Sequence, residues 1–123
     1  MSALDTIKQQ VTNNKVVLYM KGTPQFPQCG FSSKAAQMLK ACGVDKPFTV
    51  DVLQNPDIRQ GIKEYANWPT IPQLYVKGEV VGGCDIMREM FESGELHDLV
   101  CQQGIAHPHH HGLGLPFVQR HAR

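Results

Sequence analysis

A strand, a loop and the start of a helix are predicted in turn by the segment Lys15-Val-Val-Leu-Tyr-Met-Lys-Gly-Thr-Pro-Gln-Phe-Pro-Gln-Cys-Gly-Phe-Ser32. Residues 15–20 are β-branched, apolar or aromatic for the most part, which predicts a strand buried on both faces, as in a parallel sheet. Two prolines within residues 22–27 exclude a helix or a central strand there, so a loop leads into the cysteine at position 29. Helix formers dominate residues 31–42, and Gly43 is placed to end that second helix.

Hydrophobic periodicity on either side of this stretch predicts the first helix and the second strand. Leu4, Ile7 and Val11 recur at three- and four-residue steps, which indicates an amphipathic helix that ends at the Asn13-Asn14 pair. Residues 48–52 are typical of a strand. Because a strand, a helix and a strand follow in that order, we expect a right-handed crossover between two parallel strands.

The second half of the chain continues with a helix and a hairpin. Asn55-Pro56 suits a helix N-terminus, and the helix has to end before Trp68-Pro69. Residues 73–76 and 79–81 are joined by Lys77-Gly78, which is the spacing of a tight antiparallel hairpin.

Two helices close the predicted domain. Asp85 is the expected N-cap of the first, which ends at Gly94, and a short last helix follows. Together with the four strands, these elements predict an α/β fold in which a mixed four-stranded sheet is flanked by helices on both faces.

The C-terminal segment differs in composition from the rest. From about residue 105, proline and glycine recur every few residues, and four of the six histidines lie between His107 and His111. We therefore expect one domain over residues 1–104 and a mobile, His-rich tail over residues 105–123.

Composition and charge are those of an ordinary soluble globular protein. Apolar residues make up 41% and charged residues 19% of the chain, and the formal net charge is +1. Because charges of both signs are interleaved, no broad basic field exists to hold a nucleic acid or an anionic membrane. The apolar run from Val16 to Met20 is too short to span a bilayer, so we expect a cytoplasmic protein. In that reducing compartment, the four cysteines indicate free thiols, metal ligation or redox chemistry.

Cys29 is the candidate for that chemistry because it lies between a loop and a helix. Its sulfur should face the first backbone N–H groups and the positive end of the helix dipole, which lower the pKa of a thiol. Lys21, at the end of the first strand, should add a positive charge beside the thiolate. The alternative is that Cys29 is a small buried hydrophobic residue, as free cysteines often are.

A binding site for a short peptide is predicted beside this cysteine. A cis peptide bond before Pro72 would expose the backbone of Ile71, which could then pair with an extended ligand. The N–H groups of Cys84 and Asp85 at a helix start can receive a carboxylate, and Asp85 itself can pair with an amine.

The far end of this site has its own charged residues. Lys21 and Arg59 are placed to take a second carboxylate. Glutathione has the required amine, two carboxylates, amide and thiol.

Three segments of the chain resemble the monothiol glutaredoxins that have a Cys-Gly-Phe-Ser active site. They are Met20-Lys-Gly-Thr-Pro-Gln-Phe-Pro-Gln-Cys-Gly-Phe-Ser32, Trp68-Pro-Thr-Ile-Pro-Gln73 and Gly82-Gly-Cys-Asp85, and the resemblance covers roughly residues 3–103. It implies a thioredoxin-like fold, with Cys29 as the active-site cysteine and Pro72 as the family's cis-proline. It also implies a set of glutathione-binding residues, which is Lys21, Arg59, Ile71, Cys84 and Asp85.

Ser32 decides between mechanisms within this family. A dithiol enzyme would have a resolving cysteine at this position, and serine cannot release a mixed disulfide. One Cys29 thiolate and one glutathione thiolate from each of two subunits supply four ligands, which complete a [2Fe-2S] cluster bridging a homodimer. The resemblance further implies cluster delivery to apo iron-sulfur proteins, and a mixed complex with a BolA-type protein. The loop over residues 22–28 is associated with the cluster-binding members.

Two alternative functions remain open. Cys29 can act as the nucleophile of a glutathione-dependent thiol-disulfide oxidoreductase that removes glutathione from proteins, with a second glutathione resolving the intermediate. The His-rich tail can store metal, a function that would survive loss of Cys29 but not truncation after Gly104.

The other three cysteines have different expectations. Cys84 can form a regulatory disulfide with Cys29 if the two sulfurs meet the geometric limits. We expect Cys42 to be buried on the apolar face of its helix. Cys101 has no assigned role.

Overall fold

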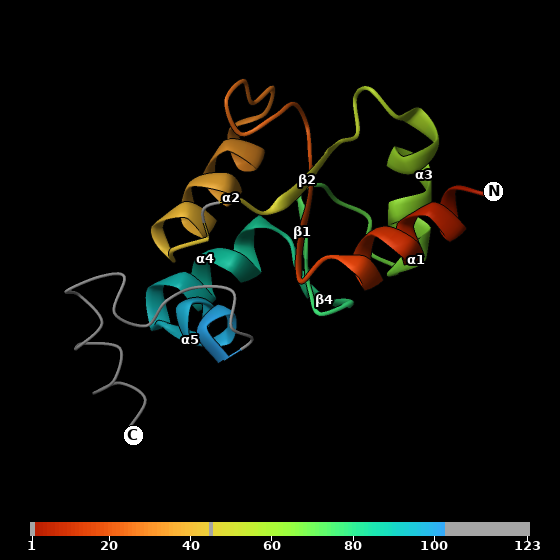
Figure 1. The fold of residues 1–123 in the computed structure, drawn as a ribbon. Coiled ribbons are helices and arrows are strands. Elements are labelled where there is room, and N and C mark those ends of the chain that lie inside the picture. The colour runs from red at the N-terminus through yellow and green to blue at the C-terminus, as the bar shows by residue number, and fades with distance from the viewer. Residues whose placement is uncertain (1, 45, 103–123) are drawn as a thin grey trace.

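A mixed four-stranded sheet separates two groups of helices in the computed structural model, which describes residues 2–44 and 46–102 (Figure 1). The predicted α/β architecture is therefore confirmed, whereas the predicted tail over residues 105–123 lies outside the described residues. In chain order the elements are α1 (Ala3–Asn13), β1 (Val16–Met20), α2 (Gly30–Ala41), β2 (Phe48–Asp51), α3 (Pro56–Tyr65), β3 (Gln73–Val76), β4 (Glu79–Gly82), α4 (Cys84–Ser93) and α5 (Glu95–Gln102).

The strands lie in the order β2-β1-β3-β4. β1 and β2 are parallel, as the crossover through α2 predicts, while β3 runs antiparallel to both β1 and β4. The β3–β4 hairpin turns through Lys77 and Gly78, whose φ angles of 52° and 82° are those of a turn that matches the twist of paired strands. The predicted hairpin is confirmed.

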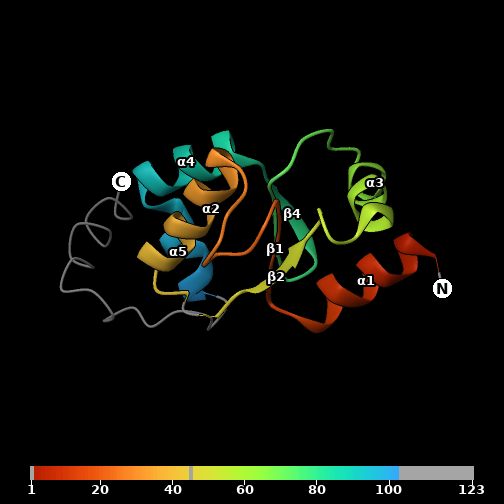
Figure 2. The ribbon, with the colours of Figure 1, turned by 90° about the horizontal axis from the view of Figure 1, so that it is seen from above.

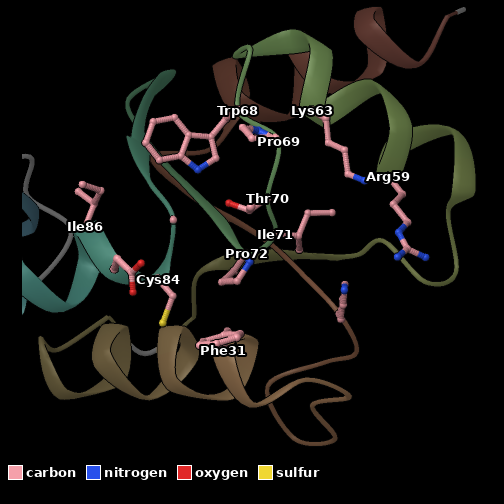
Figure 3. A pocket seen from close by; sticks show the side chains of 13 residues that line it. Phe31, Arg59, Lys63, Trp68, Pro69, Thr70, Ile71, Pro72, Cys84 and Ile86 are labelled. Carbon is pink, nitrogen blue, oxygen red and sulfur yellow. The ribbon is translucent and has the colours of Figure 1, made fainter.

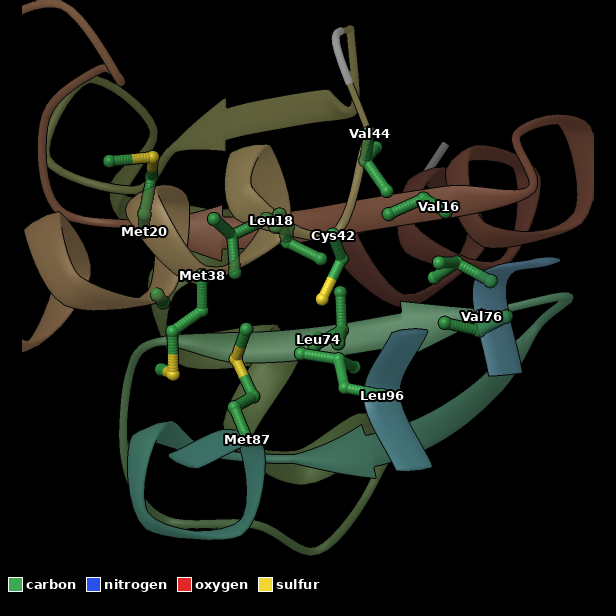
Figure 4. Packing of buried hydrophobic residues seen from close by; sticks show 13 residues of the cluster. Val16, Leu18, Met20, Met38, Cys42, Val44, Leu74, Val76, Met87 and Leu96 are labelled. Atoms are coloured by element: carbon green, nitrogen blue, oxygen red, sulfur yellow. The ribbon is translucent and has the colours of Figure 1, made fainter. Parts of the chain in front are cut away.

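β1 is the buried centre of the sheet, and all five of its residues are buried. Val16, Leu18 and Met20 pack into the core between the sheet and α2, α4 and α5 (Figure 4). Val17 and Tyr19 pack into a second core with α1 and α3, because successive side chains of a strand point to opposite faces. Figure 2 shows the helices on both sides of the sheet, so the prediction of a strand buried on both faces is confirmed.

Local caps explain where the first two helices begin and end. Ser2 Oγ accepts a hydrogen bond from the Asp5 N–H at 3.2 Å, and the Asp5 carboxylate accepts one from the Ser2 N–H at 3.4 Å, so α1 begins with a reciprocal capping box. The C-cap of α1 is Asn14, as predicted. Gly43, with a φ of 89°, follows the C-cap residue of α2 and takes the left-handed conformation that ends many helices.

Two predicted N-caps differ from the structure. Asp85 is not the N-cap of α4, because the helix begins at Cys84 and Gly83 holds the N-cap position in an extended conformation. Asp85 therefore lies within the first turn, where its carboxylate pairs with Arg88 at 3.7 Å. Asn55 does precede α3, but its side chain donates to the C=O of Asp51 at 3.0 Å and makes no cap hydrogen bond to the described residues of α3.

Candidate functional site

Cys29 is the N-cap residue of α2, so it lies at the positive end of that helix dipole. The loop before it folds back on the end of β1. The N–H of Gln28 donates to the C=O of Lys21 at 2.9 Å, and Gly22 pairs with Pro27 in an antiparallel bridge. This closed loop brings Cys29 to the helix start and leaves its side chain half-buried.

The surroundings of Cys29 lower the pKa of its thiol. The backbone N–H of Ser32 lowers this pKa the most, whereas burial of the thiol raises it. The pKa is lowered further by the backbone N–H of Phe31, the Ser32 hydroxyl and the Lys21 ammonium group. The sulfur makes no cap hydrogen bond with the described residues of α2, so these N–H groups act on it through the positive end of the helix dipole. The predicted direction of the shift is confirmed.

The other three cysteines, all within the described residues, have raised pKa values. Burial raises the pKa of Cys42 to about 12, in agreement with its predicted place in the core. Burial and the nearby Asp85 carboxylate raise the pKa of Cys84, and burial with Asp98 raises that of Cys101. Cys29 is thus the thiol in this chain that is most readily deprotonated.

A pocket with a volume of about 410 Å³ lies beside the start of α2 (Figure 3). Its walls come from the end of β1, the first turn of α2, the exposed side of α3, the segment before β3 and the first turn of α4. All five residues predicted to bind glutathione line it, which are Lys21, Arg59, Ile71, Cys84 and Asp85.

One end of this pocket carries three positive charges. Arg59 and Lys63 project from α3 toward the pocket in Figure 3, and Lys21 lines it from the end of β1. Sequence reasoning missed Lys63. Its spacing of four residues from Arg59 on a helix could have found it, because such residues lie on the same face.

The opposite end combines a helix N-terminus with a carboxylate. Cys84 and Asp85 are the first two residues of α4, so their N–H groups are among those left without partners inside the helix. The preceding Gly83 lies close to the pocket wall, since a Cβ added there would be 3.2 Å from Trp68 Nε1 and 3.3 Å from the C=O oxygen of Pro72. A glycine at this position therefore keeps the pocket open beside Trp68.

The wall between these two ends is the segment before β3. The Ile71-Pro72 peptide bond is cis, as predicted. Within residues 2–44 and 46–102, the backbone N–H and C=O of Ile71 are without a hydrogen-bond partner. They can therefore pair with an extended ligand lying in the pocket.

Gln73 is a buried polar residue that shapes this wall and was not identified from the sequence. Its side-chain Nε2 donates to the C=O groups of Trp68 at 2.8 Å and Thr70 at 3.2 Å, and its Oε1 accepts from the Tyr75 hydroxyl at 2.9 Å. The side chain is fully buried, and these bonds give partners to its amide nitrogen and its amide oxygen. They also hold residues 68–70 against the sheet.

The four cysteines and the other possible metal ligands do not form a closed site of their own within the described residues. All four cysteines are free thiols, and Cys29 is near enough to Cys84 to raise its pKa slightly, so a disulfide between them stays a prediction. Within the described part of the chain, no three His, Cys, Asp or Glu side chains gather closely enough to hold a metal ion. No helix in that part is long and apolar enough to cross a bilayer.

Comparison with known proteins gives matches of family and of fold. The family model Glutaredoxin matches residues 16–81. Glutaredoxin 4 of Haemophilus ducreyi is 53% identical over 108 residues, which cover 87% of this chain and 99% of that protein. Glutaredoxin 4 of Escherichia coli K12 is 54% identical over 99 residues, covering 80% and 85% of the two chains.

Solved structures agree with these matches. The solution structure of reduced apo GrxS14 from poplar has a TM-score of 0.68 and 52% identity, and covers 80% of this chain and 89% of its own. A buckwheat glutaredoxin in complex with glutathione has a TM-score of 0.74, covering 85% of this chain and 92% of its own, and at 24% identity it is similar in fold. The thioredoxin-like fold expected from the sequence is confirmed.

Proposed function

This chain belongs to the glutaredoxin family, and from that premise we propose that it binds glutathione beside Cys29 and uses both sulfurs to hold a [2Fe-2S] cluster between two subunits. The Cys-Gly-Phe-Ser sequence at residues 29–32 makes it a monothiol member. The cluster is the cargo, which the protein passes to apo iron-sulfur proteins in the cytoplasm. The observation that carries this proposal is the thiol with a lowered pKa beside a pocket whose charges match those of glutathione.

The charges of the pocket support glutathione as the ligand. At one end, Lys21 and Arg59 can hold the glycine carboxylate. At the other, the N-terminus of α4 at Cys84 can receive the γ-glutamyl carboxylate, and Asp85 can pair with the amine. The backbone of Ile71 lies between them, where the ligand's central cysteine can pair with it. That orientation brings the ligand's thiol to the side of the pocket nearest α2.

The arrangement of sulfur supports a cluster shared between subunits. Four thiolates complete a [2Fe-2S] cluster, whereas one chain offers Cys29 with a lowered pKa and, within its described residues, no group of three metal-ligating side chains. Two subunits and two glutathione molecules supply the missing ligands. A BolA-type protein can take the place of the second subunit in a mixed complex. Because half of the ligands are an exchangeable small molecule, the cluster can be transferred.

The lowered pKa of Cys29 also supports a second function, removal of glutathione from proteins. The Cys29 thiolate attacks the glutathione sulfur of a mixed disulfide and releases the protein as a thiolate. A second glutathione thiolate then attacks the new disulfide, which yields glutathione disulfide and restores the Cys29 thiolate. Ser32 cannot replace that second glutathione, so the rate depends on free glutathione.

The two functions are separated by anaerobic reconstitution with iron, sulfide and glutathione, followed by the visible absorption spectrum. Wild type and Cys101→Ser, a matched loss of a half-buried thiol away from the pocket, are expected to show thiolate-to-iron charge-transfer bands. Cys29→Ser and a sample without glutathione are expected to show none. Bands that persist in Cys29→Ser would contradict the proposal, and an absence of bands in wild type would leave deglutathionylation as the function.

A further inference from the structure

Two side chains from different elements hold the backbone at the end of β1. The Lys21 N–H donates to Ser32 Oγ at 3.0 Å, and the next N–H, that of Gly22, donates to Asp51 Oδ1 at 2.9 Å. Ser32 belongs to the first turn of α2 and is fully buried, whereas Asp51 is the last residue of β2. Two successive N–H groups just beyond the strand are therefore fixed by side chains instead of by the sheet.

The same backbone is also tied to the residue before Cys29. The Lys21 C=O accepts from the Gln28 N–H at 2.9 Å, which closes the active-site loop. Asp51 Oδ1 accepts a second hydrogen bond from the Leu53 N–H at 3.0 Å, so the carboxylate is itself held in one orientation. A continuous set of hydrogen bonds thus runs from Asp51 and Ser32, through residues 21–22, to Gln28 beside Cys29.

The simplest explanation of these bonds is that they satisfy backbone donors that would otherwise be buried without partners. That explanation does not account for what the held residues do. The Lys21 side chain lines the pocket and its charge favours the Cys29 thiolate, while Ser32 is buried in the first turn of the helix that Cys29 caps. The two hydrogen bonds therefore join the groups that surround the thiol.

We propose that Ser32 and Asp51 are positioning residues, which clamp the Lys21-Gly22 backbone so that the Lys21 ammonium group keeps its place beside the Cys29 sulfur. The inference rests on the part of the proposed function that makes Cys29 the reacting sulfur. It does not depend on a cluster or on glutathione.

The clamp gives the serine of the Cys-Gly-Phe-Ser sequence a role of its own. A hydroxyl oxygen accepts a hydrogen bond from a backbone N–H well, whereas a thiol sulfur is a weak acceptor and a methyl group is none. Replacing Ser32 by cysteine therefore does more than add a resolving thiol, because it also weakens the hold on Lys21.

The test is the rate at which iodoacetamide alkylates Cys29 as a function of pH, in the full-length protein without iron or glutathione. The adduct at Cys29 is quantified by peptide mass spectrometry. The variants are Ser32→Ala and Asp51→Ala, which remove the acceptors, and Asp51→Asn, which keeps an acceptor oxygen without the charge. Ser33→Ala is the matched control, since its hydroxyl is bonded to the Gln37 side chain on the outside of α2.

The direction of the shift separates positioning from a through-space effect. Loss of the Asp51 charge alone favours the thiolate and would move the profile to lower pH. The clamp predicts the opposite for Asp51→Ala, with a shift to higher pH and a rate at neutral pH about threefold lower, the effect of one ordinary hydrogen bond. Ser32→Ala shifts the same way for two reasons, because it loses both the acceptor for the Lys21 N–H and the hydroxyl that acts directly on the Cys29 thiol, so Asp51→Ala is the variant that decides. Asp51→Asn and Ser33→Ala do not shift to higher pH.

Two further measurements complete the test. If Asp51 acts by placing Lys21, then Asp51→Ala no longer raises the pH midpoint of Cys29 alkylation in a Lys21→Met background. In wild type, the amide protons of Lys21 and Gly22 exchange with solvent as slowly as those of β1. A shift to lower pH in Asp51→Ala, equal shifts in Asp51→Ala and Asp51→Asn, or rapid exchange at both amides would overturn the clamp. Exchange is measured on wild type, so rapid exchange overturns the clamp even if Asp51→Ala does not fold.

The outcome is independent of the cluster experiment. Failure of wild type to form a cluster would overturn the proposed carrier function and leave the alkylation profiles unaffected. An unchanged profile in Asp51→Ala and Ser32→Ala, with normal cluster formation, would overturn the clamp alone.

Discussion

Ser32 lies in the first turn of α2, three residues after the N-cap residue Cys29, and its backbone N–H is the largest of the influences that lower the pKa of the Cys29 thiol. This relationship follows from the position of Cys29 as the N-cap residue of α2, which leaves the first N–H groups of the helix without partners inside it. A thiol in such a place is suited both to bind a soft metal and to attack a disulfide.

The first prediction concerns the pH dependence of thiol reactivity. The thiolate is the reacting form, so a lowered pKa moves the alkylation profile of Cys29 to lower pH than that of an ordinary thiol. Burial moves the profiles of Cys42, Cys84 and Cys101 to higher pH. We expect Cys29 to be labelled first at neutral pH when adducts are located by peptide mapping. Earlier labelling of Cys84 would contradict the assignment.

The second prediction concerns the size of the pocket at Gly83. A Cβ there would lie 3.2 Å from Trp68 Nε1 and 3.3 Å from the Pro72 C=O oxygen, so Gly83→Ala forces the pocket wall to move. We expect weaker glutathione binding by isothermal titration calorimetry. Gly30→Ala is the matched control, because an added Cβ at that position meets no described atom within 4 Å. Equal affinities in the two variants would show that the ligand does not depend on this wall.

The third prediction concerns the loop before Cys29. Gly22 has a φ of 89°, and a Cβ there would be 2.5 Å from the Phe26 C=O oxygen. Gly78 has a similar φ of 82°, but its added Cβ would make only an ordinary contact, 3.7 Å from the Val11 C=O oxygen. Urea denaturation should therefore give a loss of about 1 kcal/mol for Gly78→Ala and more than about 2 kcal/mol for Gly22→Ala. Equal losses would mean that the loop accommodates the added Cβ at no cost beyond that of the positive φ.

The fourth prediction concerns the positive end of the pocket. Lys63 lies with Arg59 on the pocket side of α3, so Lys63→Gln should weaken glutathione binding about twofold to fivefold, as expected for a half-exposed ion pair. Glutathione esterified at its glycine carboxylate should lose affinity for wild type and be insensitive to Lys63→Gln. Lys8→Gln, an exposed change on α1, serves as the control. If Lys63→Gln weakened the binding of glutathione and of the ester equally, Lys63 would lie away from that carboxylate.

The sequence was sufficient to predict the features that depend on local chemistry. The two prolines before Cys29, the Lys77-Gly78 turn and the glycine after α2 each restrict the backbone in a way that needs no tertiary context. The placement of Lys21 near Cys29 followed from topology, because both lie at the same end of the parallel strands.

Features that depend on tertiary contacts were predicted less well. Asp85 is a good N-cap by residue type, but α4 begins at Cys84, and Gly83 holds the N-cap position in an extended conformation. The buried hydrogen bonds of Gln73 join segments that are separate in sequence, and no local pattern indicates them. The bond from the Gly22 N–H to Asp51 joins residues that are 29 positions apart in the sequence, and no local pattern indicates it.

Native mass spectrometry of the reconstituted protein under anaerobic conditions distinguishes a cluster shared between two chains from one held by a single chain. We expect a species that contains two chains, two glutathione molecules and one [2Fe-2S] cluster, with no such species formed by Cys29→Ser. A cluster-loaded monomer, a loaded dimer without glutathione, or an unchanged loaded species in Cys29→Ser would contradict the account.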